Sequence, residues 1–432
     1  MNILELFAGV GGFRIGLENA DPYLFETKWA NQWEPSRKSQ DAFEVYDYRF
    51  PNSRNLNISI SEISDKTFSE MDADMIVGGF PCQDYSVARS RKNEQGIEGK
   101  KGVLFWEIIR AARIIRPKYL ILENVDRLLK APSKQRGRDF AVMLAAFNRL
   151  GYSVEWRVIN AAEYGRAQRR RRVFFFIYRN DTDFALQTDR LFESENSLPQ
   201  ESRYDGYIFK SGLFAAQFPI KQTPLKNRRA YCKLSEDMVE ISDNFSGVFW
   251  NAGIMRHGQC YSVETEADYG GKPITLGEIV QPESDVPEKY FLTDAAKLEK
   301  FRYLRGAKKI ERVSSDGHTY IYSEGGMPPY DDLNLPGRTM LTSEGTVNRS
   351  THLLKINGKH RLLTPVEAER LQDFPDGWTA RKKLADGTVV EVSDKMRMFF
   401  MGNALVTEIV RKIGAFVSEI EKRTDCRVKF FR

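Results

Sequence analysis

A cysteine at the end of a predicted strand is the first residue of this sequence that could do chemistry. Cys82 stands in Gly78-Gly79-Phe80-Pro81-Cys82-Gln83, directly after the short, mostly apolar run 74–77. That run is typical of a buried parallel strand, so Cys82 should lie at the carboxyl edge of a sheet, where open α/β folds bind ligands. A thiolate there could act as a nucleophile. A buried structural thiol is the alternative for a lone cysteine.

A carboxylate follows another predicted strand. Residues 118–122 form a second apolar run, and Glu123 stands at its carboxyl end. Because the carboxyl ends of parallel strands share one edge of a sheet, Glu123 could act on the same ligand as Cys82. A helix N-cap or a surface ion pair is the alternative for this carboxylate.

A run of arginines leads into a third strand. The residues Gln168-Arg169-Arg170-Arg171-Arg172 precede the strongly apolar run 173–178. Because side chains alternate along a strand, Arg170 and Arg172 should share one side and the other two arginines the opposite side. Two guanidiniums on one face can bind phosphate, or hold a carboxylate and a base oxygen. A solvated surface is the more common setting of such a run.

The elements that position these residues are predicted strands that alternate with helices. The chain opens with a strand at 3–7, a glycine turn at 8–12 and a helix from Phe13. This order lets a ligand approach backbone N–H groups at a helix N-terminus, although a plain tight turn is equally compatible. Residues 28–34 end a second strand, where nucleotide-type folds address ribose and adenine. We therefore predict an α/β fold with a doubly wound, mostly parallel sheet.

Composition narrows the classes of protein to consider. A chain of 432 residues is expected to hold two domains. Its four cysteines show no CxxC spacing, which argues against a disulfide framework or a zinc site and suggests a reducing compartment, the cytoplasm. No apolar run is long enough to span a bilayer, and no signal peptide is expected. The net charge of +6 is compatible with a polyanionic partner.

The chain is predicted to divide into three parts. The alternation of strand and helix extends over residues 1–180, and polar stretches with Gly, Pro, Ser and Asn replace it over 181–360. We expect this middle part to form a second, smaller and irregular domain. Residues 361–432 regain order, with a helix capped by Thr364 and a last helix to about Lys422. This return segment should complete the first domain.

Taken in order, these motifs resemble those of the DNA cytosine-5 methyltransferase family. The matching residues are 7–12, 81–83, 123–125, 168–172, 361–378 and 402–403. They occur in the family's usual unpermuted order. The stretch between the first four motifs and the last two falls where the family keeps its variable target-recognition domain. The resemblance implies a Rossmann-like fold that binds S-adenosylmethionine.

The resemblance also implies a mechanism. Cys82 would add to C6 of cytosine, Glu123 would hold a proton at N3, and the activated C5 would take the methyl group. Arg170 would bond the base carbonyl or orient Glu123, and Arg172 would help to hold the same site. The target base would be flipped out of the duplex. The reaction needs no metal.

The cofactor and DNA contacts implied by the resemblance involve a larger set of residues. S-adenosylmethionine would be held by Phe7, Gly9, Val10, Gly11, Gly12, Gln32, Trp33, Asn57, Ile58, Pro81, Leu104, Asn403 and Ala404. DNA would be contacted by Gln83, Ser86, Arg338, Thr339 and Met340.

Two cofactor positions depart from the family's commonest pattern. Gln32 stands where an acid usually binds the ribose, and Glu34 follows close by, so either could take that place. Asn57 stands where an acid usually follows the third strand. Because amides can also hydrogen-bond a hydroxyl or an adenine amine, we expect altered affinity rather than lost function.

The resulting hypothesis is a sequence-specific methyltransferase acting on double-stranded DNA, as a monomer, beside a cognate restriction endonuclease in a prokaryotic restriction–modification system. An RNA cytosine methyltransferase is the nearest alternative, which the long middle segment disfavours. A catalytically dead DNA-binding relative is disfavoured by the presence of Cys82, Glu123 and Arg170. A nicotinamide oxidoreductase is disfavoured because the glycines do not follow GxGxxG.

Overall fold

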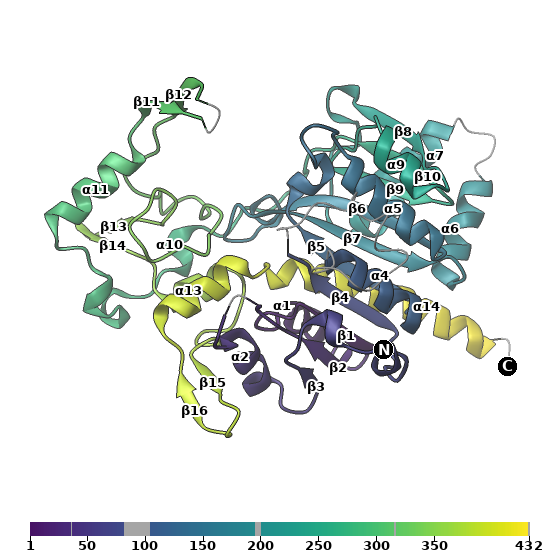
Figure 1. The fold of residues 1–432 in the computed structure, drawn as a ribbon, viewed down its shortest axis with the longest axis horizontal. Coiled ribbons are helices and arrows are strands. Elements are labelled where there is room, and N and C mark those ends of the chain that lie inside the picture. Colours follow the sequence, from purple (N-terminus) through teal and green to yellow (C-terminus); the bar gives the residue numbers. More distant parts are fainter. Residues whose placement is uncertain (36, 82–103, 195–199, 315–316, 431–432) are drawn as a thin grey trace.

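A single large sheet forms the centre of the molecule (Figure 1). The structure is a computed structural model, which describes residues 1–430 except 36, 82–103, 195–199 and 315–316. The sheet has ten strands in the order β3-β2-β1-β4-β5-β7-β6-β9-β10-β8. Its strands are β1 (Asn2–Leu6), β2 (Glu26–Asn31), β3 (Arg54–Leu56), β4 (Met75–Gly79), β5 (Tyr119–Asn124), β6 (Tyr152–Asn160), β7 (Arg171–Arg179), β8 (Arg229–Lys233), β9 (Ala252–Arg256) and β10 (Gln259–Val263).

The first five strands are parallel to one another. Strand β7 then runs antiparallel between β5 and β6. This arrangement confirms the predicted α/β class, and it brings the carboxyl ends of β1, β4 and β5 to the same edge as the start of β7. Below, this edge is called the carboxyl edge of the sheet.

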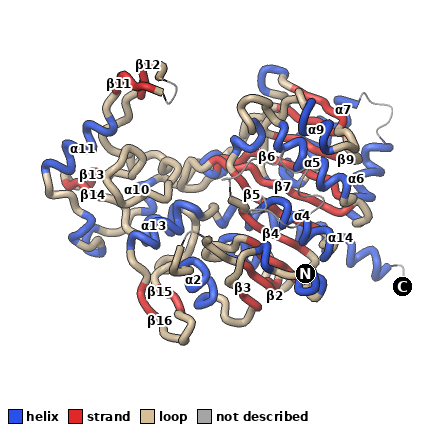
Figure 2. The backbone as a smooth tube through the Cα atoms, viewed as in Figure 1, coloured by secondary structure: helices blue, strands red, loops and turns tan. Residues whose placement is uncertain are grey.

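Helices cover both faces of the sheet, as the doubly wound prediction requires (Figure 2). On one face, buried strand residues such as Leu4 cluster with α4 (Leu104–Ile115) and α5 (Arg138–Arg149). On the other, their sequence neighbours, such as Ile3, cluster with α1 (Gly12–Ala20) and α14 (Thr407–Phe430). The other helices beside this sheet are α2 (Asp41–Arg49), α3 (Asp65–Ser69), α6 (Asp183–Ser194), α7 (Gln200–Gly206), α8 (Leu213–Gln217) and α9 (Met238–Asn244).

The last helix returns the end of the chain to the sheet. Gly16 of α1 permits this approach, because a Cβ atom there would lie only 2.5 Å from the Cβ of Val410 in α14. None of the described helices combines the length and apolar character needed to cross a membrane.

The middle segment does not form one domain apart from the sheet, and the predicted boundary at residue 180 is corrected accordingly. Strand β9 pairs with β6, and β10 and β8 follow it, so residues up to 263 extend the central sheet. The extension is antiparallel. It had no counterpart in the sequence prediction, because its pairing partner β6 lies far away in the sequence.

A smaller lobe begins after this extension and occupies the left of Figure 1. Its elements are α10 (Leu276–Ile279), α11 (Ala295–Arg305), β11 (Lys308–Val313), β12 (Thr319–Glu324), β13 (Leu354–Ile356) and β14 (Lys359–Arg361). We call residues 271–361 the small lobe. Its short hairpins and long irregular connections match the irregular character expected of the middle segment.

The chain leaves the small lobe through α12 (Pro365–Leu371), a hairpin of β15 (Arg381–Lys383) and β16 (Val389–Glu391), and α13 (Asp394–Asn403). The predicted cap of α12 is present, since the Thr364 hydroxyl accepts a bond from the Glu367 N–H and the Glu367 carboxylate accepts one from the Thr364 N–H. These elements join the small lobe to the sheet.

Candidate active site

Glu123 lies at the carboxyl edge, beside the end of β4. Its backbone is in register with Gly79 in the neighbouring parallel strand. A Cβ atom at Gly79 would lie 2.9 Å from a carboxylate oxygen of Glu123. Glycine at position 79 therefore leaves room for the Glu123 side chain, a role that sequence analysis did not assign to it.

An ion pair with Arg172 holds this carboxylate. The Arg172 Nε lies 2.8 Å from Oε1 of Glu123, and both side chains are largely buried. Burial raises the pKa of Glu123, while the cations of Arg172 and Arg170 act in the opposite direction. The carboxyl group therefore has a raised pKa while remaining in contact with a cation, which suits a group that must gain and lose a proton.

Arg170 points into the protein, whereas Arg169 and Arg171 are exposed, so the two pairs lie on opposite sides as the alternation predicts. The Arg170 guanidinium donates to two backbone carbonyls, that of Met340 at 3.1 Å and that of Gly402 at 3.0 Å. Arg172, rather than Arg170, is therefore the arginine that forms an ion pair with Glu123 and orients it. Arg170 instead joins the small lobe, the start of β7 and the end of α13.

Other contacts reinforce this junction. The Met340 N–H donates to the side-chain oxygen of Gln168 at 2.9 Å. Gly402 packs so closely on the small lobe that a Cβ atom there would lie 2.4 Å from the backbone nitrogen of Thr342. Sequence analysis missed the packing roles of Gln168 and Gly402 at this junction, although both lie in motifs that it singled out.

The residues of the small lobe that are predicted to contact DNA are bonded or buried within the protein in this structure. Met340 is fully buried in the junction, so it cannot reach a nucleic acid in this structure. The Arg338 guanidinium is bound to Asp331, at 2.6 Å, and to the carbonyl of Thr351. The Thr339 hydroxyl donates to the carbonyl of Arg169 at 2.6 Å. Thr339 and Met340 therefore bond across the junction, whereas Arg338 is held within the small lobe.

The predicted nucleophile, Cys82, lies outside the described residues, as do Gln83 and Ser86. The chain just before them is fixed: the Asn124 side-chain amide donates to the carbonyl of Phe80 at 3.0 Å. Asn124 directly follows Glu123, so one strand end carries the carboxylate and also anchors the segment that leads to Cys82.

The expected cofactor residues gather around the ends of β1 and β2. Phe7, Gly9 and Gly11 have positive φ angles, of 54°, 55° and 91°. The side-chain oxygen of Gln32 accepts a bond from the Gly9 N–H at 2.8 Å. The carboxylate of Glu34 instead pairs with Arg37 at 2.9 Å. Of the two candidates for the ribose position, Gln32 is therefore the one that faces the glycine turn.

A buried oxygen atom that accepts no hydrogen bond from the described residues lies near the ends of β1 and β2. The side-chain oxygen of Asn57 is buried and has no hydrogen-bond partner in the described part of the chain. Its neighbour Ile58 and the indole of Trp33 are each 38% exposed. An acceptor without a partner beside two exposed apolar side chains fits a flat aromatic base with an amine, so these residues are compatible with an adenine-containing cofactor.

The remaining cofactor candidates lie on three other elements. Leu104 is the first residue of α4, Asn403 ends α13, and Ala404 follows it. Val10 is buried, and its carbonyl accepts a bond from the Trp378 indole at 2.8 Å. Pro81 is exposed at the end of the described part of its segment. Gly12 packs near Leu405, one residue beyond Ala404, which places the turn after α13 against the glycine turn.

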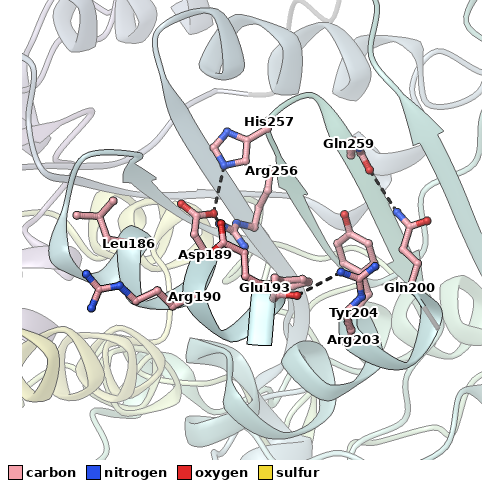
Figure 3. A pocket seen from close by; sticks show the side chains of 11 residues that line it. Leu186, Asp189, Arg190, Glu193, Gln200, Arg203, Tyr204, Arg256, His257 and Gln259 are labelled. Atoms are coloured by element: carbon pink, nitrogen blue, oxygen red, sulfur yellow. Dashed lines mark hydrogen bonds and ion pairs between the residues drawn. The ribbon is translucent and has the colours of Figure 1, made fainter. Parts of the chain in front are cut away.

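A cavity of about 800 Å³ lies elsewhere, among α6, α7 and the turn between β9 and β10 (Figure 3). This turn is at the opposite edge of the sheet from Glu123, because β9 runs antiparallel to β6 and β6 antiparallel to β7. Within it, Asp189 pairs with Arg256 and with His257. The cavity is therefore separate from the candidate active site.

Comparisons with known proteins agree with this geometry. The sequence profile of the C-5 cytosine-specific DNA methylases matches residues 1–419. The chain belongs to this family. It is 53% identical to the type II methyltransferase M.Sau3AI of Staphylococcus aureus, over 98% of this chain and 97% of that protein. It is 34% identical to M.HhaI of Haemophilus parahaemolyticus, over 53% of this chain and 66% of that protein.

Solved structures support the fold of this methylase. The Dnmt2 methyltransferase of S. pombe superposes with a TM-score of 0.57 at 12% identity, covering 97% of this chain and 98% of that one. Within the described residues of the methylase, no group of three His, Cys, Asp or Glu side chains is placed to hold a metal ion.

The junction predicts different effects for two neighbouring arginines. Replacing Arg170 by Met leaves the carbonyls of Met340 and Gly402 without donors, so we expect the free energy of unfolding to fall by about 2 to 4 kcal/mol. Replacing the exposed Arg169 by Met should change the free energy of unfolding by less than about 0.5 kcal/mol. Chemical denaturation of both variants measures the difference, and equal stabilities would contradict the assigned role.

Proposed function

We propose that this methylase transfers a methyl group from S-adenosylmethionine to C5 of a cytosine that is turned out of double-stranded DNA, through a covalent bond between Cys82 and C6. The Glu123–Arg172 ion pair, at the carboxyl edge and one strand from the segment leading to Cys82, carries this proposal. Together these groups match what a cytosine needs: a nucleophile for C6, an acid at N3 and a cation nearby.

The steps follow from the chemistry of the base. C5 of cytosine is a poor nucleophile until a group adds to C6, and a thiolate such as that of Cys82 is suited to do so. As the C6–S bond forms, Glu123 gives a proton to N3 and so neutralises the charge that builds on the ring. Arg172 holds the Glu123 carboxylate in place and stabilises it once the proton has left.

The remaining steps restore the ring. S-adenosylmethionine would supply the methyl group from its sulfonium sulfur to the activated C5. Loss of the C5 proton to solvent and of the Cys82 thiolate from C6 then leaves 5-methylcytosine, and N3 returns its proton to Glu123. Because these atoms are stacked inside a duplex, the base must leave the helix before Cys82 can reach C6.

The cofactor would lie at the ends of β1 and β2. The backbone of Gly9 to Gly12 would approach its methionine end, and Gln32 would face the ribose. Trp33 and Ile58 would contact the adenine, whose amine could donate to the unpartnered oxygen of Asn57. This assignment is supported by the exposure of the two apolar side chains and by the orientation of Gln32.

Double-stranded DNA is the proposed substrate. The small lobe supplies a second body next to the carboxyl edge, which suits recognition of the bases around the target. The similarity to M.Sau3AI supports a type II restriction–modification system, in which the enzyme would act as a monomer beside a cognate endonuclease. An RNA substrate is the alternative, and parallel assays on duplex DNA and RNA of the same sequence distinguish the two.

The covalent step can be trapped. Duplex DNA carrying 5-fluorocytosine at the target should form a denaturation-stable adduct with the wild-type enzyme, because fluorine cannot leave as a proton does. Cys82→Ala should form no adduct and no 5-methylcytosine, whereas Cys232→Ala, a change in β8, should behave as wild type. Mass spectrometry of the adduct is the measurement. Methylation by Cys82→Ala would refute the covalent mechanism.

Glu123→Gln tests the acid. An amide keeps the shape of the side chain but cannot deliver a proton, so the single-turnover rate should fall by about 10² to 10⁴, with DNA affinity nearly unchanged. The rate of wild type should also decline at high pH, where Glu123 loses its proton. Because burial raises the pKa of Glu123, this decline should come at a higher pH than for an ordinary glutamate. An equal loss of affinity and rate would show a structural role instead.

Asn57→Ala tests the adenine contact. Losing the unpartnered acceptor should weaken S-adenosylmethionine binding by about 10-fold, the effect of one lost hydrogen bond. Asn55→Ala, a change in the neighbouring strand β3, is the control and should leave cofactor affinity close to wild type. Equilibrium dialysis without DNA gives both dissociation constants. Unchanged affinity in Asn57→Ala would place the adenine elsewhere.

A further inference from the structure

A second set of cations lies at the carboxyl edge, outside the motifs discussed so far. Residues 127–136, which we call the basic loop, carry Arg127, Lys130, Lys134 and Arg136 and no acidic residue. The loop begins two residues after β5, the strand that ends with Glu123 and Asn124. Its residues 127–130 belong to the short helical turn η3 (Asp126–Lys130), whose acidic first residue precedes the loop, and α5 follows the loop.

Several bonds hold the basic loop in a compact shape. Within it, the Gln135 N–H donates to the carbonyl of Pro132 at 3.1 Å, and the Asp139 N–H donates to that of Ala131 at 3.2 Å. The Gln135 side-chain amide donates to the carbonyl of Phe245 at 3.2 Å. The loop therefore presents its charges from a fixed surface, which lowers the entropy lost when a partner binds.

Two arginines next to the loop are neutralised, but three cations in it have no ion-pair partner in the described part of the chain. Arg138 pairs with Asp139, and Arg171 with Asp126. Lys130, Lys134 and Arg136 are exposed, and none of them forms an ion pair with another described residue. Arg169 adds an exposed guanidinium at the start of β7, on the same edge. A surface of uncompensated cations beside the site favours a polyanionic partner.

The type of side chain indicates which part of the partner is bound. Lysine and arginine on an irregular, polar loop are suited to phosphate oxygens, which fix the position of a duplex without reading its sequence. The loop has no asparagine and only one glutamine, Gln135, whose amide is already bound to Phe245. Reading of base edges by this loop is therefore not favoured.

We propose that the basic loop binds the phosphate backbone of the substrate DNA beside the flipped cytosine, through Lys130, Lys134 and Arg136. The proposal rests on the proposed function, because it takes duplex DNA as the substrate. It assigns to the catalytic side of the enzyme a contact that sets affinity, leaving choice of sequence to other surfaces.

The test is the salt dependence of DNA binding. We compare the wild type with the triple variant Lys130→Gln, Lys134→Gln, Arg136→Gln, using cognate and scrambled duplexes between about 50 and 200 mM KCl. If each side chain neutralises one phosphate, the slope of log affinity against log salt should become shallower by about 2 to 3. Affinity for both duplexes should fall by the same factor, so that their ratio is unchanged.

A second triple variant controls for net charge. Lys28→Gln, Lys66→Gln and Arg423→Gln remove the same charge from β2, α3 and α14, where these side chains are 40%, 86% and 77% exposed. This control should keep a slope close to wild type. A slope change equal to that of the loop variant, or an unchanged slope in the loop variant, would overturn the proposal.

Two further measurements separate this proposal from the proposed function. The loop variant should melt at the wild-type temperature and, at saturating DNA, should methylate at the wild-type single-turnover rate, because none of its substituted side chains touches the reacting base. Absence of 5-methylcytosine with the wild-type enzyme would refute the proposed function. Methylation by the wild type together with an unchanged slope in the loop variant would refute the loop contact alone.

Discussion

The buried guanidinium of Arg170 is the contact on which the arrangement of the site depends. It links three segments that are distant in the sequence, by donating to the carbonyls of Met340 and Gly402 from the start of β7. A buried cation is costly unless its donors find acceptors, so the small lobe and the end of α13 must dock together around it. Gly402 makes this docking possible, since any side chain there would collide with the backbone of Thr342. The Arg170 guanidinium thus couples the site edge to the small lobe, together with the bonds of Gln168 to Met340 and of Thr339 to Arg169.

The same constraint separates the roles of the two inward arginines. Because the guanidinium of Arg170 is occupied by carbonyls, only Arg172 is close enough to form an ion pair with Glu123. Burial opposes ionisation of Glu123, and the two cations favour it. The pKa of the carboxyl group is therefore raised by burial, while the cations of Arg172 and Arg170 limit the rise. Gly79 contributes by leaving the space that this carboxylate occupies.

Sequence patterns predicted the features that depend on neighbouring residues. Glu123 could be placed because it ends an apolar strand, and strand alternation predicted that Arg170 and Arg172 share one side, without saying which side faces inward. The extension by β8, β9 and β10 could not be predicted, because β9 joins the sheet through β6 and nothing local marks that pairing. The burial of Met340 could not be predicted for a similar reason. Its burial is set by Gln168 and Gly402, which only the folded chain brings beside it.

The amides at Gln32 and Asn57 change the charge of the proposed cofactor pocket more than its shape. Gln32 accepts a bond from the Gly9 N–H that a carboxylate would accept at least as well, so this bond gives no reason for an amide. Glu34 cannot replace the missing charge, because it is paired with Arg37. The methyl donor carries a positive sulfonium, and its thioether product does not. A pocket with fewer negative charges attracts the positive donor less strongly, so the donor and the product bind with more similar affinities. The preference for the donor must then come more from shape and hydrogen bonds.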